Sequence, residues 1–226
     1  MIRRQTRAAS AAHHVWAFLR SAPLTFIWLA ILLGTTIAQR SMSPAELDRT
    51  LGQRSTNLAH LSHDPLRVLW SSLFWIDGYF WFPYALAFLI FHVPAERWLG
   101  SLRWLLVGLT GHVVATYLSE GILSLAIRSG IRGPEMVNVQ DVGVSYFLAA
   151  VIAVLTYHIA TPWRYLYLVG VLGFYVVPVV TGFTFTTFGH LCAALVGFAW
   201  YPMVRHRGAP WNPMAAIRQY KNPTSR

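Results

Sequence analysis

A serine and a histidine are the residue types in this chain that are best suited to hydrolysis. Ser145 lies in the stretch DVGVSY at residues 141–146, and His190 follows about 45 residues later. A serine hydroxyl is a poor nucleophile until a base removes its proton, and a histidine titrates near neutral pH and suits that role. Gly143 frees the backbone just before Ser145, so amide donors there can face an oxyanion. This pattern suggests an activated serine.

The same residues also have plain structural interpretations. A serine near a helix start hydrogen-bonds within its own helix, and a histidine between helices packs and hydrogen-bonds there. Asp141, just before the expected helix, is most simply its N-cap. Asp77 is the one charge in an apolar stretch, and a lone carboxylate in lipid is costly. We therefore expect Asp77 to face the bundle interior or a wet cavity.

The composition places these residues in a membrane protein. Of 226 residues, 55% are hydrophobic and 12% are charged, whereas about a quarter of a typical soluble domain is charged. The formal charge of +10 does not indicate nucleic-acid binding, because the basic residues cluster at span ends and tails. The single Cys192 excludes an internal disulfide, and the histidine spacing makes no metal set. We predict no metal and no cofactor.

Long apolar runs predict an all-α, polytopic fold with six transmembrane helices. The first run follows a basic start and is short, so it also resembles a signal peptide, but five further runs favour its retention as a span. A capped short helix is expected from Ser43-Pro44-Ala45-Glu46 in the polar connection after it. We predict a basic segment at 1–21, a membrane domain at 22–204 with spans at about 22–38, 69–92, 102–127, 142–160, 165–181 and 184–204, and a basic tail at 205–226.

The basic residues orient these spans. Six spans put both termini on one side of the membrane, and 12 of the 18 basic residues then share that side with the single acid Glu96. Positive residues gather on the cytoplasmic side, which places Ser145 and His190 near the outer face. The 12 are Arg3, Arg4, Arg7, Arg20, Arg97, Arg103, Arg164, Arg205, Arg207, Arg218, Lys221 and Arg226.

Two stretches before the serine resemble the rhomboid family. Residues 94–103 (PAERWLGSLR) resemble that family's short connection between its second and third spans, which has a Glu and then Leu-Gly-Ser before an arginine. Residues 64–69 (DPLRVL) with Phe74 resemble the family's approach to its second span. The order and spacing of these stretches match the family better than either stretch does by itself.

The serine and histidine continue this resemblance. Residues 143–146 are similar to the family's Gly-x-Ser-Gly, and His190 with Gly197 seven residues later is similar to its Ala-His-x-x-Gly-x-x-x-Gly. Tyr146 stands where the first motif has its last glycine, Gly189 stands where alanine precedes the histidine, and Ala193 stands where a glycine follows it. The likeness covers residues 64–204.

The second span departs from the family more strongly. Rhomboids usually carry a His-x-x-x-Asn pair there that helps to stabilise the oxyanion. Counting back from Glu96, those positions fall near Phe80 and Tyr84, and neither is His or Asn. We therefore predict that Asp77 or Tyr84 contacts the Ser145–His190 site, as an orienting group or as a hydroxyl donor.

The resemblance implies an intramembrane serine peptidase in which Ser145 and His190 cleave a client's transmembrane helix near its outer end. The alternative is a catalytically inactive rhomboid-fold protein that binds membrane clients, which Tyr146 and the missing His/Asn pair favour. A transporter or channel is disfavoured because the chain shows no internal repeats. We expect as partners a transmembrane client and the lipid bilayer, and as location a bacterial-type plasma membrane with both termini cytoplasmic.

Overall fold

The structure is a computed structural model that describes residues 12–78, 80–142 and 144–215. Over these residues the regular structure is helical, and the only strand-like feature is an isolated bridge between Ile159 and Trp211. This confirms the predicted all-α class.

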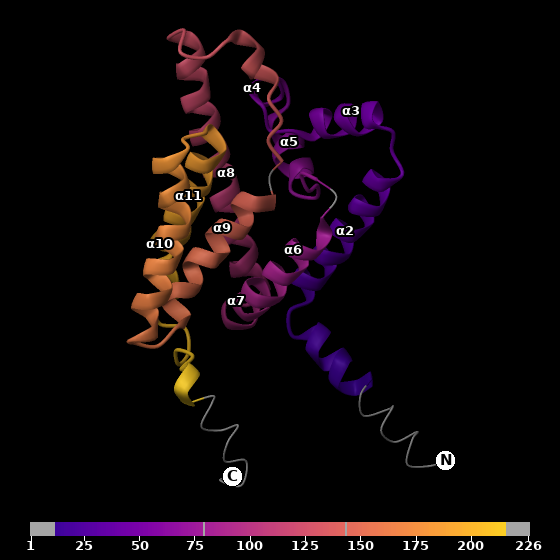
Figure 1. The fold of residues 1–226 in the computed structure, drawn as a ribbon. Coiled ribbons are helices and arrows are strands. Elements are labelled where there is room, and N and C mark those ends of the chain that lie inside the picture. Colours follow the sequence, from indigo (N-terminus) through magenta and orange to yellow (C-terminus); the bar gives the residue numbers. More distant parts are fainter. Residues whose placement is uncertain (1–11, 79, 143, 216–226) are drawn as a thin grey trace, which may run out of the picture.

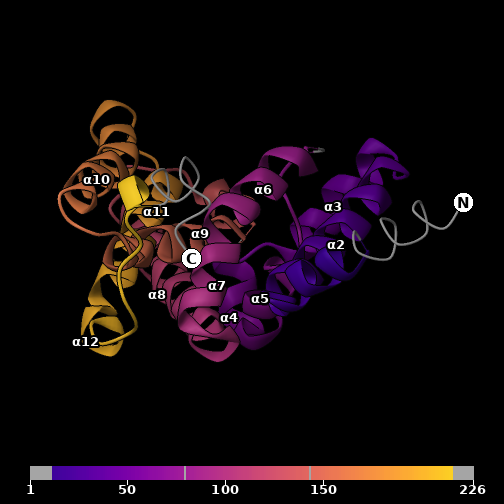
Figure 2. The ribbon, with the colours of Figure 1, turned by 90° about the horizontal axis from the view of Figure 1, so that it is seen from below.

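Within the described part of the chain, five apolar helices form the body of the molecule. Three of them are long and apolar enough to cross a membrane: α2 (Pro23–Arg40), α8 (Ser101–Arg128) and α10 (Trp163–Thr181). The shorter ones are α9 (Val144–Val154), which continues into the 3-10 turn η3 (Leu155–His158), and α11 (Phe185–Ala199). Seen from below in Figure 2, α2 lies on one side of the molecule and α10 with α11 on the other.

The predicted second span requires a correction. Instead of one helix over 69–92, α5 (Pro65–Ser72) ends early, and a continuous helical run then begins at Trp81. Gly78 between them adopts a left-handed φ of 81°, a conformation that glycine tolerates and that interrupts a helix. The run consists of α6 (Trp81–Ala87), the π-helical turn η1 (Phe88–His92) and α7 (Val93–Leu99).

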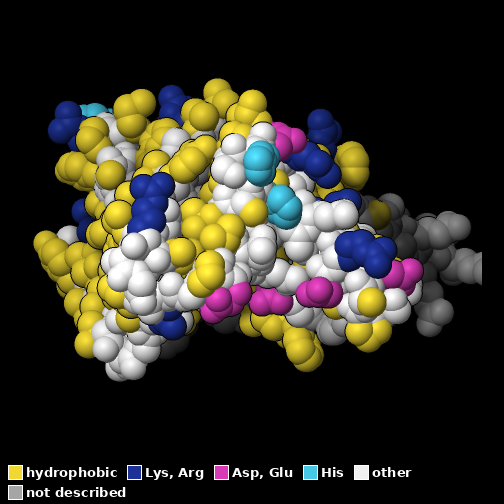
Figure 3. All heavy atoms as spheres, turned by 90° about the horizontal axis from the view of Figure 1, so that it is seen from above, with side chains coloured by type: hydrophobic (Ala, Val, Ile, Leu, Met, Phe, Trp, Pro, Cys, Tyr) yellow, Lys and Arg dark blue, Asp and Glu magenta, His cyan; other side chains and the backbone are white. Residues whose placement is uncertain are grey.

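The polar connection after α2 is largely helical. It forms α3 (Pro44–Arg54) and α4 (Leu58–His63), followed directly by α5, and α3 lies across the upper end of α2 (Figure 1). The capping box predicted for α3 is confirmed, because Ser43 N donates to Glu46 Oε2 at 2.8 Å and Glu46 N donates to Ser43 Oγ. Figure 3 views this end of the molecule and shows acidic, basic and histidine side chains together on it.

Small residues let α8, α9 and α11 approach closely. A Cβ on Gly108 would overlap the Phe147 ring, and a Cβ on Gly111 would overlap Ala150. On α11, Ala193 and Gly197 are buried against the same helices. Without a hydrophobic driving force in lipid, such close contact is what holds membrane helices together. The helices that carry Ser145 and His190 are therefore in close contact.

The lower ends of α2 and α7 are joined by Glu96. Its carboxylate accepts hydrogen bonds from Leu24 N at 3.0 Å and Thr25 N at 2.8 Å, the first amides of α2, and from the Ser101 hydroxyl. Glu96 is only 2% exposed. A carboxylate at a helix N-terminus satisfies amides that have no partner within the helix, so Glu96 docks α2 onto the bundle.

Replacing Glu96 is expected to loosen α2. In Glu96→Ala the two buried amides and the serine lose their acceptor, which costs about 2 kcal/mol and lowers the unfolding midpoint in detergent by about 5 °C. Glu96→Gln keeps one acceptor oxygen and should fall between the wild type and Glu96→Ala. Thermal unfolding of the three proteins in one detergent measures this effect, and an unchanged midpoint for Glu96→Ala would contradict it.

The described part of the C-terminal tail packs against the lower end of the helix bundle. Trp98 Nε1 donates to the Arg207 carbonyl at 2.8 Å, and Ala160 N donates to the Trp211 carbonyl at 2.9 Å. Most of the predicted basic segment at 1–21 and the end of the tail lie outside the described residues. The described chain begins and ends at the same end of the bundle (Figure 1).

Candidate active site

Ser145 and His190 lie in the upper turns of neighbouring helices. Ser145 is the second residue of α9, and His190 is the sixth residue of α11. The start of α11 is fixed by Thr184, whose hydroxyl accepts a hydrogen bond from Thr187 N at 3.0 Å. Because α9 and α11 pack against each other, the two side chains reach the same space.

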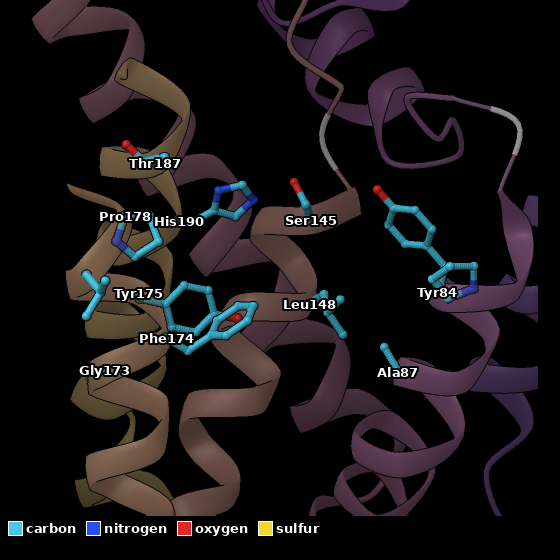
Figure 4. A pocket seen from close by; sticks show the side chains of 12 residues that line it. Tyr84, Ala87, Ser145, Leu148, Gly173, Phe174, Tyr175, Pro178, Thr187 and His190 are labelled. Atoms are coloured by element: carbon cyan, nitrogen blue, oxygen red, sulfur yellow. The ribbon is translucent and has the colours of Figure 1, made fainter. Parts of the chain in front are cut away.

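That space is a cavity of about 790 Å³ between four helices. Within it the Ser145 hydroxyl lies between the His190 ring and the Tyr84 hydroxyl (Figure 4). Ser145 and His190 are both partly exposed, so a ligand in the cavity can touch both. The lining residues are Pro83, Tyr84 and Ala87 on α6, Ser145 and Leu148 on α9, Gly173, Phe174, Tyr175, Val177 and Pro178 on α10, and Thr187 and His190 on α11.

The pair is open rather than hydrogen-bonded. Over the described residues no hydrogen bond joins Ser145 to His190, although both side chains face the shared cavity (Figure 4). Hydrogen bonds between a nucleophile and its base are often long before a substrate binds and tighten in the complex. The arrangement therefore permits proton transfer once a substrate fills the cavity.

Two tyrosine rings flank the His190 imidazole. The His190 ring meets Tyr146 edge to face, with centroids 5.0 Å apart and planes at 71°, and lies nearly parallel to Tyr175 at 6.4 Å. The Thr186 carbonyl, one turn earlier on α11, also interacts with the imidazole. The ring therefore has aromatic neighbours on two sides.

Tyr146 and Asp141 form a buried pair beside the cavity. The Tyr146 hydroxyl donates to Asp141 Oδ2 at 3.0 Å, and Tyr146 is completely buried. Burial raises the Asp141 pKa to about 6, against a lowering contribution from the Tyr146 hydrogen bond. The predicted N-cap role of Asp141 is corrected, because α9 begins at Val144 and the Asp141 carboxylate bonds Tyr146 instead.

The other predicted site residues differ in their positions. Tyr84 lines the cavity opposite His190, as expected of a hydroxyl donor. Asp77 does not line it: this residue is exposed in the bend before α6, and it acts on Tyr84 and Asp141 only through its charge. Asp77 was expected to face the bundle interior or a wet cavity; the chain there is not helical, and the side chain is exposed and lies outside the lining of the Ser145–His190 cavity. Gly143 lies outside the described residues.

Comparison with known proteins places this arrangement in a family. A family model described as rhomboid-like protein matches residues 17–210, a span that contains both Ser145 and His190. The chain belongs to the rhomboid-like family. Neither the curated proteins nor the solved structures contain a match. Family membership together with the apolar helices identifies an integral membrane protein of polytopic, all-α architecture.

Two departures of this rhomboid-like chain from the family motifs are physically linked. A Cβ on Gly189 would lie 2.5 Å from the Tyr146 hydroxyl oxygen and 2.6 Å from the ring carbon that bears it. Real Cβ atoms do not approach other atoms so closely. The Tyr146 side chain can therefore be accommodated only because residue 189, just before the histidine, is a glycine. The sequence contained both departures, but only the packing of α9 against α11 connects them.

Proposed function

We propose that this protein is an intramembrane serine peptidase in which Ser145 is the nucleophile and His190 is the base. The observation that carries the proposal is that both side chains face one cavity from packed helices, with the Tyr84 hydroxyl across from them (Figure 4). Tyr84 supplies a hydroxyl in the part of the cavity where the family's second-span donors are missing.

The chemistry follows from these positions. His190 removes the proton from Ser145 Oγ as the oxygen attacks the carbonyl carbon of the peptide bond. The developing oxyanion accepts hydrogen bonds from the Tyr84 hydroxyl and from first-turn amides of α9, which have no partner within their helix. The protonated His190 then gives its proton to the leaving amine, and water, again activated by His190, hydrolyses the acyl-enzyme.

The cavity walls fit a client that arrives through the membrane. Several apolar side chains that line the cavity from α6 and α10 are exposed, among them Pro83, Phe174 and Pro178. An exposed apolar rim between two membrane helices favours a partner that is itself in lipid. A transmembrane helix hides its carbonyls in hydrogen bonds, so the client must unwind locally to be cut near its outer end.

Cleavage of a reconstituted client tests this proposal. A single-span protein with a helix-destabilising segment at its outer end is incorporated with the enzyme in liposomes, and the products are mapped by mass spectrometry. We expect one cut near that end, absent with Ser145→Ala. A client that remains intact across several such sequences would count against the peptidase.

A client-binding protein without catalysis is the second candidate. Two observations favour it: Ser145 and His190 are not hydrogen-bonded, and a tyrosine faces them in place of the family's His/Asn pair. Under this alternative, the wild type and Ser145→Ala bind a transmembrane client equally and neither cleaves it.

We also propose a bacterial-type plasma membrane with both termini cytoplasmic. The shared lower end of the described chain and the basic residues near it, such as Arg97 and Arg207, support this orientation. Reporter fusions at each terminus that are active only in the cytoplasm test it.

A further inference from the structure

We propose that Tyr146 is a positioning residue that holds the His190 imidazole toward Ser145. This inference rests on the proposed serine peptidase and adds to it the group that orients its base. A general base in such a site needs a partner that fixes its ring. Over the described residues no Asp or Glu hydrogen-bonds His190, so apart from the Thr186 carbonyl the groups that can orient the ring are the side chains packed against it.

Tyr146 is placed to do this. Its ring meets the imidazole edge to face at 5.0 Å, within the favourable range for aromatic pairs. Tyr175 lies nearly parallel to the imidazole at 6.4 Å. With neighbours in two directions, the imidazole loses rotational freedom before a substrate arrives.

Tyr146 is itself held by a chain of hydrogen bonds. Its hydroxyl donates to Asp141 Oδ2 at 3.0 Å. Asp141 in turn is fixed through its backbone, because Asp141 N donates to Ser55 Oγ at 2.7 Å and Thr56 N donates to the Asp141 carbonyl at 3.0 Å. Ser55 and Thr56 join α3 to α4 and are completely buried. The outer helices therefore secure the tyrosine from above.

Gly189 makes this contact possible. Any side chain there would collide with the Tyr146 hydroxyl and ring, at 2.5 and 2.6 Å from a Cβ. The tyrosine thus occupies the space directly beside the backbone that carries His190. A residue that only filled the interior would have no need to approach His190 so closely.

The test compares Tyr146→Leu with Phe147→Leu. Both residues are completely buried on α9 and both lose a ring, but Phe147 packs on Trp28 and Trp104 rather than on His190. We expect fluorophosphonate labelling of Ser145 to slow about tenfold in Tyr146→Leu. In Phe147→Leu it should remain within about twofold of the wild type, because that side chain does not touch the pair. Tyr146→Phe keeps the ring and should slow labelling only about threefold.

A second measurement does not depend on activity. In protein with isotope-labelled histidine, the His190 ring resonance is assigned by its absence from His190→Asn, and we expect it to move in Tyr146→Leu and to stay in place in Phe147→Leu. A resonance unmoved in Tyr146→Leu overturns the proposal, as does an unchanged labelling rate in that variant when the wild type reacts. If the wild type is not labelled at all, the peptidase fails, and the resonance still decides the positioning role.

Substitution of Gly189 tests the same contact independently. We expect Gly189→Ala to slow labelling about tenfold in the wild-type background, because the new methyl group displaces the tyrosine. In a Tyr146→Gly background the same change should cause no further slowing. Equal slowing in both backgrounds would mean that Gly189 acts elsewhere, and it would overturn the role assigned to the Tyr146 contact.

Discussion

Replacing Ser145 with alanine is expected to abolish covalent labelling by a fluorophosphonate probe. The probe reacts only with a serine whose hydroxyl a neighbouring base activates. Ser145 and His190 face one cavity of about 790 Å³ that is large enough for such a probe. The loss in rate should be at least about a thousandfold, because a nucleophile cannot be replaced by its neighbours.

The companion variants separate the roles in the site. His190→Ala should slow labelling almost as strongly as the loss of Ser145, since nucleophile and base act as a unit. Tyr84→Phe should slow it by about tenfold to a hundredfold if its hydroxyl donates to the oxyanion. Cys192→Ser leaves the cavity lining unchanged and serves as a control. Wild-type labelling that persists in Ser145→Ala would show that the reactive group lies elsewhere.

The sequence predicted the parts of this structure that depend on local pattern. Apolar runs located α2, α8, α9, α10 and α11, because a helix in lipid must be apolar over its whole length. The capped start of α3 followed from Ser43, Pro44 and Glu46, three neighbours whose interactions are local. Ser145 and His190 were paired from their residue types and from their motifs, and the two side chains do face one cavity.

Features that depend on distant contacts were not predictable from pattern. Asp77 was expected inside a helix, but α5 ends at Ser72, and Asp77 lies exposed in the non-helical stretch before α6, next to the left-handed Gly78. Asp141 was expected to cap α9, but it instead bonds the Tyr146 hydroxyl and is secured by Ser55, which is 86 residues away in the sequence. No spacing rule links residues so far apart, and only the folded bundle brings them together.

Gly197→Ala is expected to destabilise the bundle more than any other single change to a glycine on α11. The new Cβ would overlap the Ala150 carbonyl oxygen and would lie 2.9 Å from Ala153 Cβ. A backbone carbonyl on a packed helix cannot rotate away as a flexible side chain can, so α9 and α11 must separate. Overpacking of this kind costs about 3 kcal/mol, or about 8 °C in the unfolding midpoint.

Gly121→Ala is the matched control, because Gly121 also lies inside a membrane helix but a Cβ added there would have no atom within 4 Å. The methyl group meets no obstacle and should stabilise α8 by up to about 1 kcal/mol, since alanine favours the helix more than glycine does. Because α9 and α11 carry Ser145 and His190, their separation in Gly197→Ala should also remove fluorophosphonate labelling while Gly121→Ala retains it. Equal midpoints for the two variants would mean that α9 and α11 are not in backbone contact, and the meeting of serine and histidine would lose its structural basis.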